Sequence, residues 1–123
     1  VCPWNRFAQQ GRELLLTARH DLPDLSLDEL LRMTPQRFAE VFRRTPIKRL
    51  KLRGLLRNAC VVAGNSDDPA VLPALLELAC HELPMVRVHA VWAIHRLGAG
   101  ASLSVARASE TDADVLREYS AWE

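Results

Sequence analysis

A thirty-residue internal repeat constrains the fold of this chain more than any other feature of its sequence. An apolar residue followed by arginine recurs at that spacing, as Leu56-Arg57, Val86-Arg87 and Leu116-Arg117. Four positions after each apolar residue stands a small one: Cys60, Ala90 and Ser120. Small side chains at this spacing let paired helices approach closely. The repeat therefore predicts a stack of helix pairs, in which each pair buries the apolar face of the next.

Helix start signals recur along the chain after residue 25. Ser26 precedes two acids, and proline follows a capping residue in Thr34-Pro35, Thr45-Pro46 and Asp68-Pro69. Together with Pro84 and Asp112, these signals predict helices over 27–31, 35–42, 46–64, 69–78, 84–97, 101–108 and 112–123. No segment alternates between apolar and polar residues as a half-buried strand does. We therefore expect an all-α fold.

The predicted architecture is a short α-solenoid of two to three helix pairs over residues 26–123, preceded by an irregular segment over residues 1–25. In the helix at 46–64 we expect Gly54 as the candidate point for a bend or break, and an inner side formed by Ile47, Leu50, Leu55, Ala59, Val62 and Ala63. Val115, Leu116 and Tyr119 are expected inside in the last helix, and Ala90 and Ala93 at helix–helix contacts.

Composition is that of an ordinary soluble domain, with 49% hydrophobic and 25% charged residues among 123. No apolar run approaches the roughly 20 residues that a membrane span needs. Three cysteines at widely spaced positions do not resemble a disulfide framework, so we expect a reducing, cytoplasmic location. We also expect the protein to be a monomer. The chain begins with Val1, which we interpret as a start within a longer protein.

The positive charge is concentrated in one segment. Residues 41–66 contain seven basic side chains and no acidic one, although the whole chain has a net charge of only +1. The basic residues are Arg43, Arg44, Lys48, Arg49, Lys51, Arg53 and Arg57. Such a run is either a solvated helix face or a surface for a polyanion. Arg49, Arg53 and Arg57 are four residues apart, so a continuous helix would align them for a phosphate backbone.

Several other residues have two open interpretations. Asn58 either contacts RNA beside the basic run or bonds to a neighbouring loop. Arg87 and Arg117 stand at the repeat position of Arg57, and we expect them to pair with an acid of a neighbouring turn or repeat. Cys2-Pro3 is either an ordinary cysteine or the closing element of a ferredoxin-type cluster motif, in which the last cysteine ligates iron. No histidines are spaced as a metal-ligand set.

Parts of the sequence resemble two known families. The stretch Val86-Arg87-x-x-Ala90-Val91-x-Ala93 resembles the second helix of a HEAT repeat. Three motifs in order resemble the C-terminal part of the epoxyqueuosine reductase family, which completes queuosine at the tRNA wobble position. They are Cys2-Pro3-Trp4-Asn5, Thr45-Pro46-Ile47-Lys48-Arg49, and Arg53-Gly54-Leu55-Leu56-Arg57-Asn58 leading into Ala63-Gly64-Asn65.

The second resemblance implies a cobalamin-dependent oxidoreductase with two [4Fe-4S] clusters, in which Cys2 is a metal ligand. It also implies that the catalytic domain and the other cluster cysteines precede Val1. No catalytic residue is expected within this chain, and no complete cofactor. The expected partner is the tRNA anticodon stem-loop, bound by Lys48, Arg49, Lys51, Arg53, Arg57 and Asn58. The alternatives are a HEAT-like protein-interaction scaffold that binds no nucleic acid and, more remotely, an iron–sulfur electron carrier.

Overall fold

The computed structural model describes residues 25–123, and within that range every regular element is a helix. The α-helices are α2 (Leu27–Leu31), α3 (Pro35–Val41), α4 (Lys51–Gly64), α5 (Leu72–Leu78), α6 (Pro84–Arg96), α7 (Ser104–Ala108) and α8 (Ala113–Ser120). Three 3₁₀ helices precede α4, α5 and α7: η2 (Pro46–Leu50), η3 (Pro69–Val71) and η4 (Gly100–Leu103). The prediction of an all-α fold is confirmed.

The predicted helix caps explain where four of these elements begin, namely α2, α3, η3 and α8. Ser26 and Glu29 form a reciprocal capping box at α2, with Ser26 N donating to Glu29 Oε2 over 2.7 Å. The side-chain oxygens of Thr34, Asp68 and Asp112 accept backbone N–H groups in the first turns that follow them. Each cap satisfies donors that have no partner inside the helix, and therefore fixes the residue at which the helix starts.

The segment after Thr45 differs from the prediction of one helix over 46–64. Thr45 makes no side-chain capping bond, and Pro46 starts only the 3₁₀ helix η2. Lys51 then adopts φ +62°, in the left-handed region, before α4 continues to Gly64. The chain is therefore broken at Lys51 and not at Gly54, which is buried inside α4 against the Leu50 side chain.

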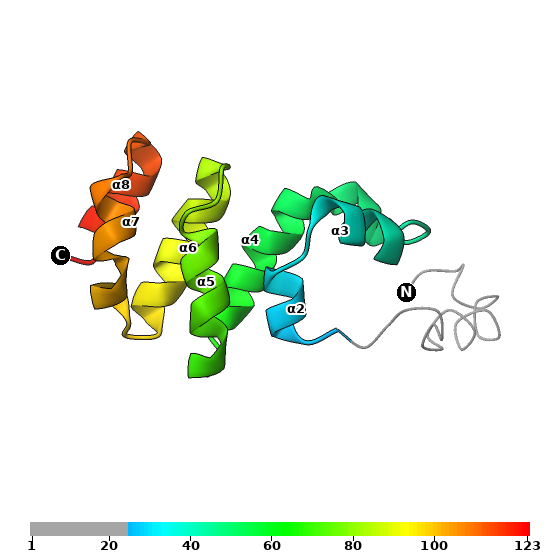
Figure 1. Cartoon of the computed structure of the whole chain (residues 1–123), viewed down its shortest axis with the longest axis horizontal. Helices are drawn as coiled ribbons and strands as arrows, with labels where there is room; N and C mark the ends of the chain where they lie inside the picture. Colours follow the sequence, from blue (N-terminus) through cyan, green and yellow to red (C-terminus); the bar gives the residue numbers. More distant parts are fainter. Residues whose placement is uncertain (1–24) are drawn as a thin grey trace, which may run out of the picture.

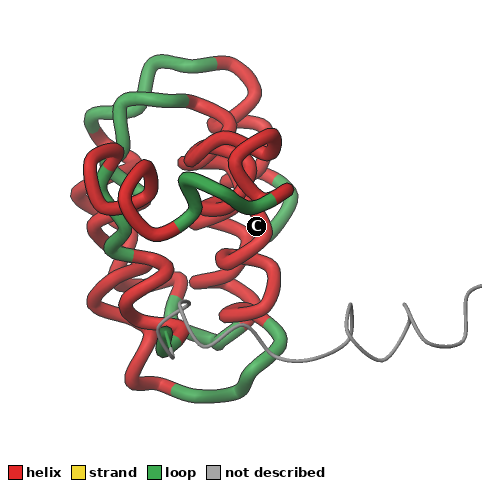
Figure 2. Tube along the Cα trace, turned by 90° about the vertical axis from the view of Figure 1, so that its right-hand side faces the viewer, coloured by secondary structure: helices red, strands yellow, loops and turns green. Residues whose placement is uncertain are grey.

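The helices form an elongated array (Figure 1). Helix α6 packs against α4 on one side and α8 on the other, and α5 covers α6. Helix α2 lies against both α4 and α5, and Arg32 on its C-terminal end bonds Glu77 of α5 over 2.6 Å. A view at a right angle shows the helices standing in two rows with loops at the two ends (Figure 2), as expected for stacked helix pairs.

The main core runs through the whole array and is built from small and branched side chains. Leu56, Leu75, Val86, Ile94 and Val115 are almost completely buried in it. Ala90 and Ala93 have no exposed surface, so the prediction that they lie at helix contacts is confirmed. A second, smaller cluster of Met33, Phe38 and Phe42 covers the end of the array near α3, where the two phenyl rings are 5.3 Å apart.

Three apolar residues that we expected inside are instead exposed. Val62 is 57% exposed, Ile47 37% and Leu116 38%. The buried face of α4 is formed by Leu56, Ala59, Cys60 and Ala63, spaced i, i+3, i+4 and i+7, and Val62 lies outside that stripe. Ile47 precedes the break at Lys51, so it does not continue this face. In α8 the inward positions are Val115 and Tyr119, four apart, and Leu116 lies outside that stripe.

Candidate nucleic-acid interface

The candidate interface is the basic surface formed by Lys48, Arg49, Lys51, Arg53 and Arg57. Lys48 and Arg49 lie on η2, Lys51 is the residue at the break, and Arg53 and Arg57 follow on α4. All are exposed except Arg57, which is half-buried. Within residues 25–123 none of the five forms an ion pair. Their charge is therefore available to a bound anion.

The predicted alignment of three arginines on one continuous helix is only partly right. Arg53 and Arg57 are four residues apart on α4 and share a face. Arg49 precedes the break at Lys51, so its direction is set by η2 and not by the α4 axis. The basic surface consequently bends around the start of α4, with some of its cations on η2 and the others on α4.

Within the described residues Asn58 bonds its neighbour Arg57 and not another loop, and its contact with RNA stays a prediction. Its Oδ1 accepts a hydrogen bond from Arg57 Nε over 3.1 Å. Asn58 is exposed, and it holds the half-buried Arg57 guanidinium from the adjacent position. This neutral acceptor orients Arg57 without cancelling its charge.

The equivalent arginine of the next repeat has a different environment. Arg87 donates from Nε and Nη2 to the two carboxylate oxygens of Glu110, over 2.8 and 3.0 Å, and from Nη1 to the carbonyls of His81 and Glu82. Arg117 makes only a surface pair with Asp114, at 3.1 Å. Both arginines pair with an acid as predicted. Thirty residues before Glu110 stands Cys80, which has no carboxylate to pair with Arg57.

A groove borders the basic surface and was not predicted from the sequence. It has a volume of about 450 Å³ and lies between the start of α3, the first turns of α4 and the α5–α6 loop. The lining residues are Met33, Thr34, Pro35, Lys51, Leu52, Arg53, Leu56, His81, Glu82 and Leu83. Three segments far apart in the sequence contribute to it, so no local motif could have indicated it.

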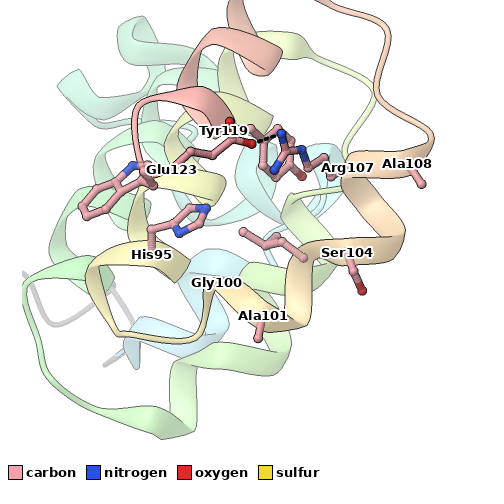
Figure 3. Close-up of a pocket in the computed structure, with 10 residues that line it drawn as sticks. His95, Gly100, Ala101, Ser104, Arg107, Ala108, Tyr119 and Glu123 are labelled. Carbon is pink, nitrogen blue, oxygen red and sulfur yellow. Dashed lines mark hydrogen bonds and ion pairs between the residues drawn. The ribbon is translucent and has the colours of Figure 1, made fainter.

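A second pocket, of about 580 Å³, lies at the far end of the array (Figure 3). The His95 ring stacks on Trp122 with centroids 5.3 Å apart, and Arg107 pairs with Glu123 at its rim. Burial lowers the pKa of the His95 imidazole, an effect that Glu118 opposes and Arg107 reinforces. None of the residues that line this pocket belongs to the basic surface.

The described residues do not fit the metal groups that the family resemblance implies. In residues 25–123 no three His, Cys, Asp or Glu side chains come together to hold an ion. Cys60 is buried, and burial raises the pKa of its thiol to about 12, while Cys80 is exposed. Cys2, the predicted cluster ligand, lies outside the described residues. In the same range no helix is long and apolar enough to cross a bilayer.

Comparison with known families agrees with the stacked helix pairs. A family model described as HEAT repeats matches residues 53–122, from α4 to just past α8. The chain belongs to the HEAT-repeat family. The match begins at Arg53, so the repeat family covers α4, α6 and α8 with the connecting elements between them, but neither η2 nor the helices before it. No solved structure is significantly similar to the chain.

Curated relatives of this HEAT-repeat chain are epoxyqueuosine reductases, as the motifs indicated. The Pseudomonas aeruginosa protein is 34% identical over 101 residues, 80% of this chain and 27% of that protein. The Xanthomonas campestris pv. campestris protein is 34% identical over 99 residues, covering 80% and 28%. The Escherichia coli K12 protein is 32% identical over 94 residues, covering 76% and 25%. The chain thus spans about a quarter of the length of these relatives.

Proposed function

We propose that this chain is the tRNA-holding part of a longer cytoplasmic epoxyqueuosine reductase, and that it binds the anticodon stem-loop through the basic surface. Reduction of the modified base then takes place in the part of the enzyme outside this chain, which also holds the cobalamin and the iron–sulfur clusters. The similarity to epoxyqueuosine reductases supports the assignment of tRNA as the substrate. The basic surface supports the assignment of tRNA binding to this part of the enzyme.

The single observation that carries the proposal is a set of five neighbouring cations that form no ion pair with the described residues. Elsewhere in the array, Arg32, Arg87 and Arg117 do pair with acids. Lysine and arginine that contact phosphates release condensed counterions, which favours binding at low salt. Arginine also stacks on unpaired bases, the kind of base that an anticodon loop presents.

The test is fluorescence anisotropy of a labelled anticodon stem-loop with the 123-residue chain across a range of salt concentrations. We expect the double substitution Arg53→Glu, Arg57→Glu to weaken binding and to flatten the salt slope by about one to two units, since roughly 0.7–0.9 counterions are released per phosphate contact. In the full-length enzyme the same change should raise KM for tRNA more than it lowers kcat, because uniform binding is lost.

The matched control is Arg96→Glu, Arg117→Glu, which makes the same change in charge at exposed positions outside the basic surface. We expect the control to weaken binding much less. Equal affinity for the wild type and the Arg53/Arg57 variant at every salt concentration would contradict the proposal. It would favour a HEAT-repeat scaffold for proteins, for which the exposed Val61 and Val62 on α4 offer an apolar contact.

A further inference from the structure

We propose that the groove beside the basic surface receives one unstacked nucleobase that carries an amino group: cytosine, adenine or guanine, in preference to uracil. The inference rests on the proposed function and specifies how the bound RNA is recognised. The groove is lined by three segments, residues 33–35, 51–56 and 81–83, that meet at one edge of the array (Figure 1). Its volume of about 450 Å³ lies within the range of small-ligand sites.

The walls of the groove suit the faces of a planar base. Met33 and Leu56 are almost fully buried and belong to the cores beneath, while Leu52 is half-buried and Leu83 is 39% exposed at the margin. Proteins that hold an extruded base commonly sandwich it between apolar or aromatic side chains. The thioether of methionine is polarizable and adapts to an irregular neighbour.

The charge around the groove favours a nucleotide over an apolar peptide or a second copy of the chain. Lys51 and Arg53 line the groove and also belong to the basic surface, so the cations that reach backbone phosphates stand at its mouth. Neither forms an ion pair within residues 25–123. A nucleotide whose base lies in the groove places its phosphates near these two side chains. An uncharged occupant has no negative charge to pair with them.

The polar groups of the groove favour an amino-bearing base. Glu82 lines it with a carboxylate that makes no hydrogen bond or ion pair with the described residues, and a carboxylate only accepts hydrogen bonds. His81 Nδ1 accepts the N–H of Leu83 over 3.0 Å, so a neutral ring carries its proton on Nε2 as a donor. An exocyclic amino group offers two N–H donors to the Glu82 carboxylate, whereas uracil offers only the one N–H of its ring.

The first experiment measures the affinity of the 123-residue chain for short oligocytidylate and oligouridylate of equal length. We expect a preference for oligocytidylate of about tenfold, the discrimination typical of a well-placed base contact. Glu82→Gln should reduce this preference to less than about twofold, because the amide both donates and accepts. The salt slope should stay unchanged, since no cation is altered.

Two further variants separate the groove from the basic surface. Leu83→Ala should weaken binding of both oligonucleotides without changing the salt slope. Arg53→Glu should flatten the salt slope while some base preference remains. Glu40→Gln on α3 removes an exposed carboxylate outside the groove and serves as the matched control, for which we expect the wild-type preference.

A second readout uses the anticodon stem-loop with 2-aminopurine, itself an amino-bearing base, at successive loop positions. We expect one position to become more fluorescent on binding as its base leaves the stack, and Glu82→Gln and Leu83→Ala to reduce that increase. RNA that binds with normal salt dependence but with no base preference, and with no effect of either variant, would overturn the base site and leave the basic surface standing. Absence of any salt-dependent RNA binding would overturn both.

Discussion

One arginine recurs at the same repeat position in α4, α6 and α8, and its three copies meet different partners. Arg87 bonds a carboxylate that is only 4% exposed, Arg117 a carboxylate at the surface, and Arg57 a neutral amide. Burial raises the pKa of the Glu110 carboxyl group, but the hydrogen bonds and charge of Arg87, together with the backbone N–H groups of Asp112 and Thr111, outweigh it and lower that pKa. The repeat pattern therefore places the side chain, but the opposing residue determines whether it stabilises the array or remains available to a ligand.

We predict that Arg87→Met destabilises the protein by about 3 kcal/mol, because it leaves the buried Glu110 carboxylate without its charged partner. Arg117→Met, at the equivalent position, should cost less than about 1 kcal/mol, since an exposed ion pair contributes little. Urea denaturation of the two variants gives the comparison directly. Equal losses of stability in the two variants would show that the buried ion pair between Arg87 and Glu110 contributes no more than the exposed pair of Arg117.

The two described cysteines should differ in reactivity. The Cys60 thiol is buried with a pKa of about 12, whereas Cys80 is exposed. Because the thiolate is the reactive form, iodoacetamide at neutral pH should modify Cys80 in the folded protein and leave Cys60 unmodified. Peptide mass mapping before and after denaturation measures this. Rapid modification of Cys60 under native conditions would mean that α4 does not pack against α6 as described.

Protonation of His95 should destabilise the fold. Its pKa is lowered by burial, so on acidification the unfolded chain takes up a proton before the folded one does. The stability that neutral His95 contributes is fully present above its ordinary pKa of about 6.5 and is lost as the pH falls from there toward the lowered value. The midpoint temperature of thermal unfolding should therefore fall more steeply between about pH 7 and pH 5 for the wild type than for His95→Phe. This variant keeps an aromatic ring against Trp122.

At the scale of elements, the contact between α4 and α6 sets how closely the repeats stack. A methyl group added at Gly64 would lie 2.6 Å from the Trp92 ring and 3.0 Å from Ala93 Cα. The two helices are therefore already in contact through their smallest residues. Larger side chains of the two helices, such as Leu56 and Ile94, are also buried in the core.

Ala93→Leu should therefore cost roughly 1–3 kcal/mol, because the added atoms have no space between α4 and α6. Ala39→Leu, at an exposed position of α3, is the control and should change stability by less than about 0.5 kcal/mol. Thermal unfolding of both variants tests the assignment. A stable Ala93→Leu variant would contradict the close approach of these helices.

At the scale of the whole molecule, the basic surface is confined to one part of the array. It lies on η2 and the first turns of α4, whereas the ion pairs of Arg87 with Glu110 and of Arg117 with Asp114 belong to the later repeats. No metal-binding group is present in residues 25–123.

Anaerobic reconstitution of the 123-residue chain with iron and sulfide should accordingly yield no stoichiometric cluster. Cys60 is buried, Cys80 belongs to no group of three potential ligands within residues 25–123, and Cys2 alone supplies one thiolate where a [4Fe-4S] cluster takes four. Iron and sulfide analysis after desalting measures the outcome. A monomer that retains one full cluster would contradict the interpretation that the other ligands belong to a longer protein.

The sequence by itself determined the helices and their stacking. Capping residues such as Ser26 and Asp112 satisfy the first N–H groups locally, and the small residues at thirty-residue spacing make close packing possible only in register. These signals act over a few residues or repeat along the chain, so they can be read without knowing the tertiary contacts.

Only the tertiary structure decided the shape of the candidate site. The positive φ of Lys51 separates Arg49 from Arg53, although their spacing of four suggested one helix face. The groove brings Met33, Leu52 and Leu83 together from three segments, and the lack of an acid opposite Arg57 depends on which loop packs beside α4. These features arise from contacts between residues distant in the sequence, where a spacing rule within one helix carries no information.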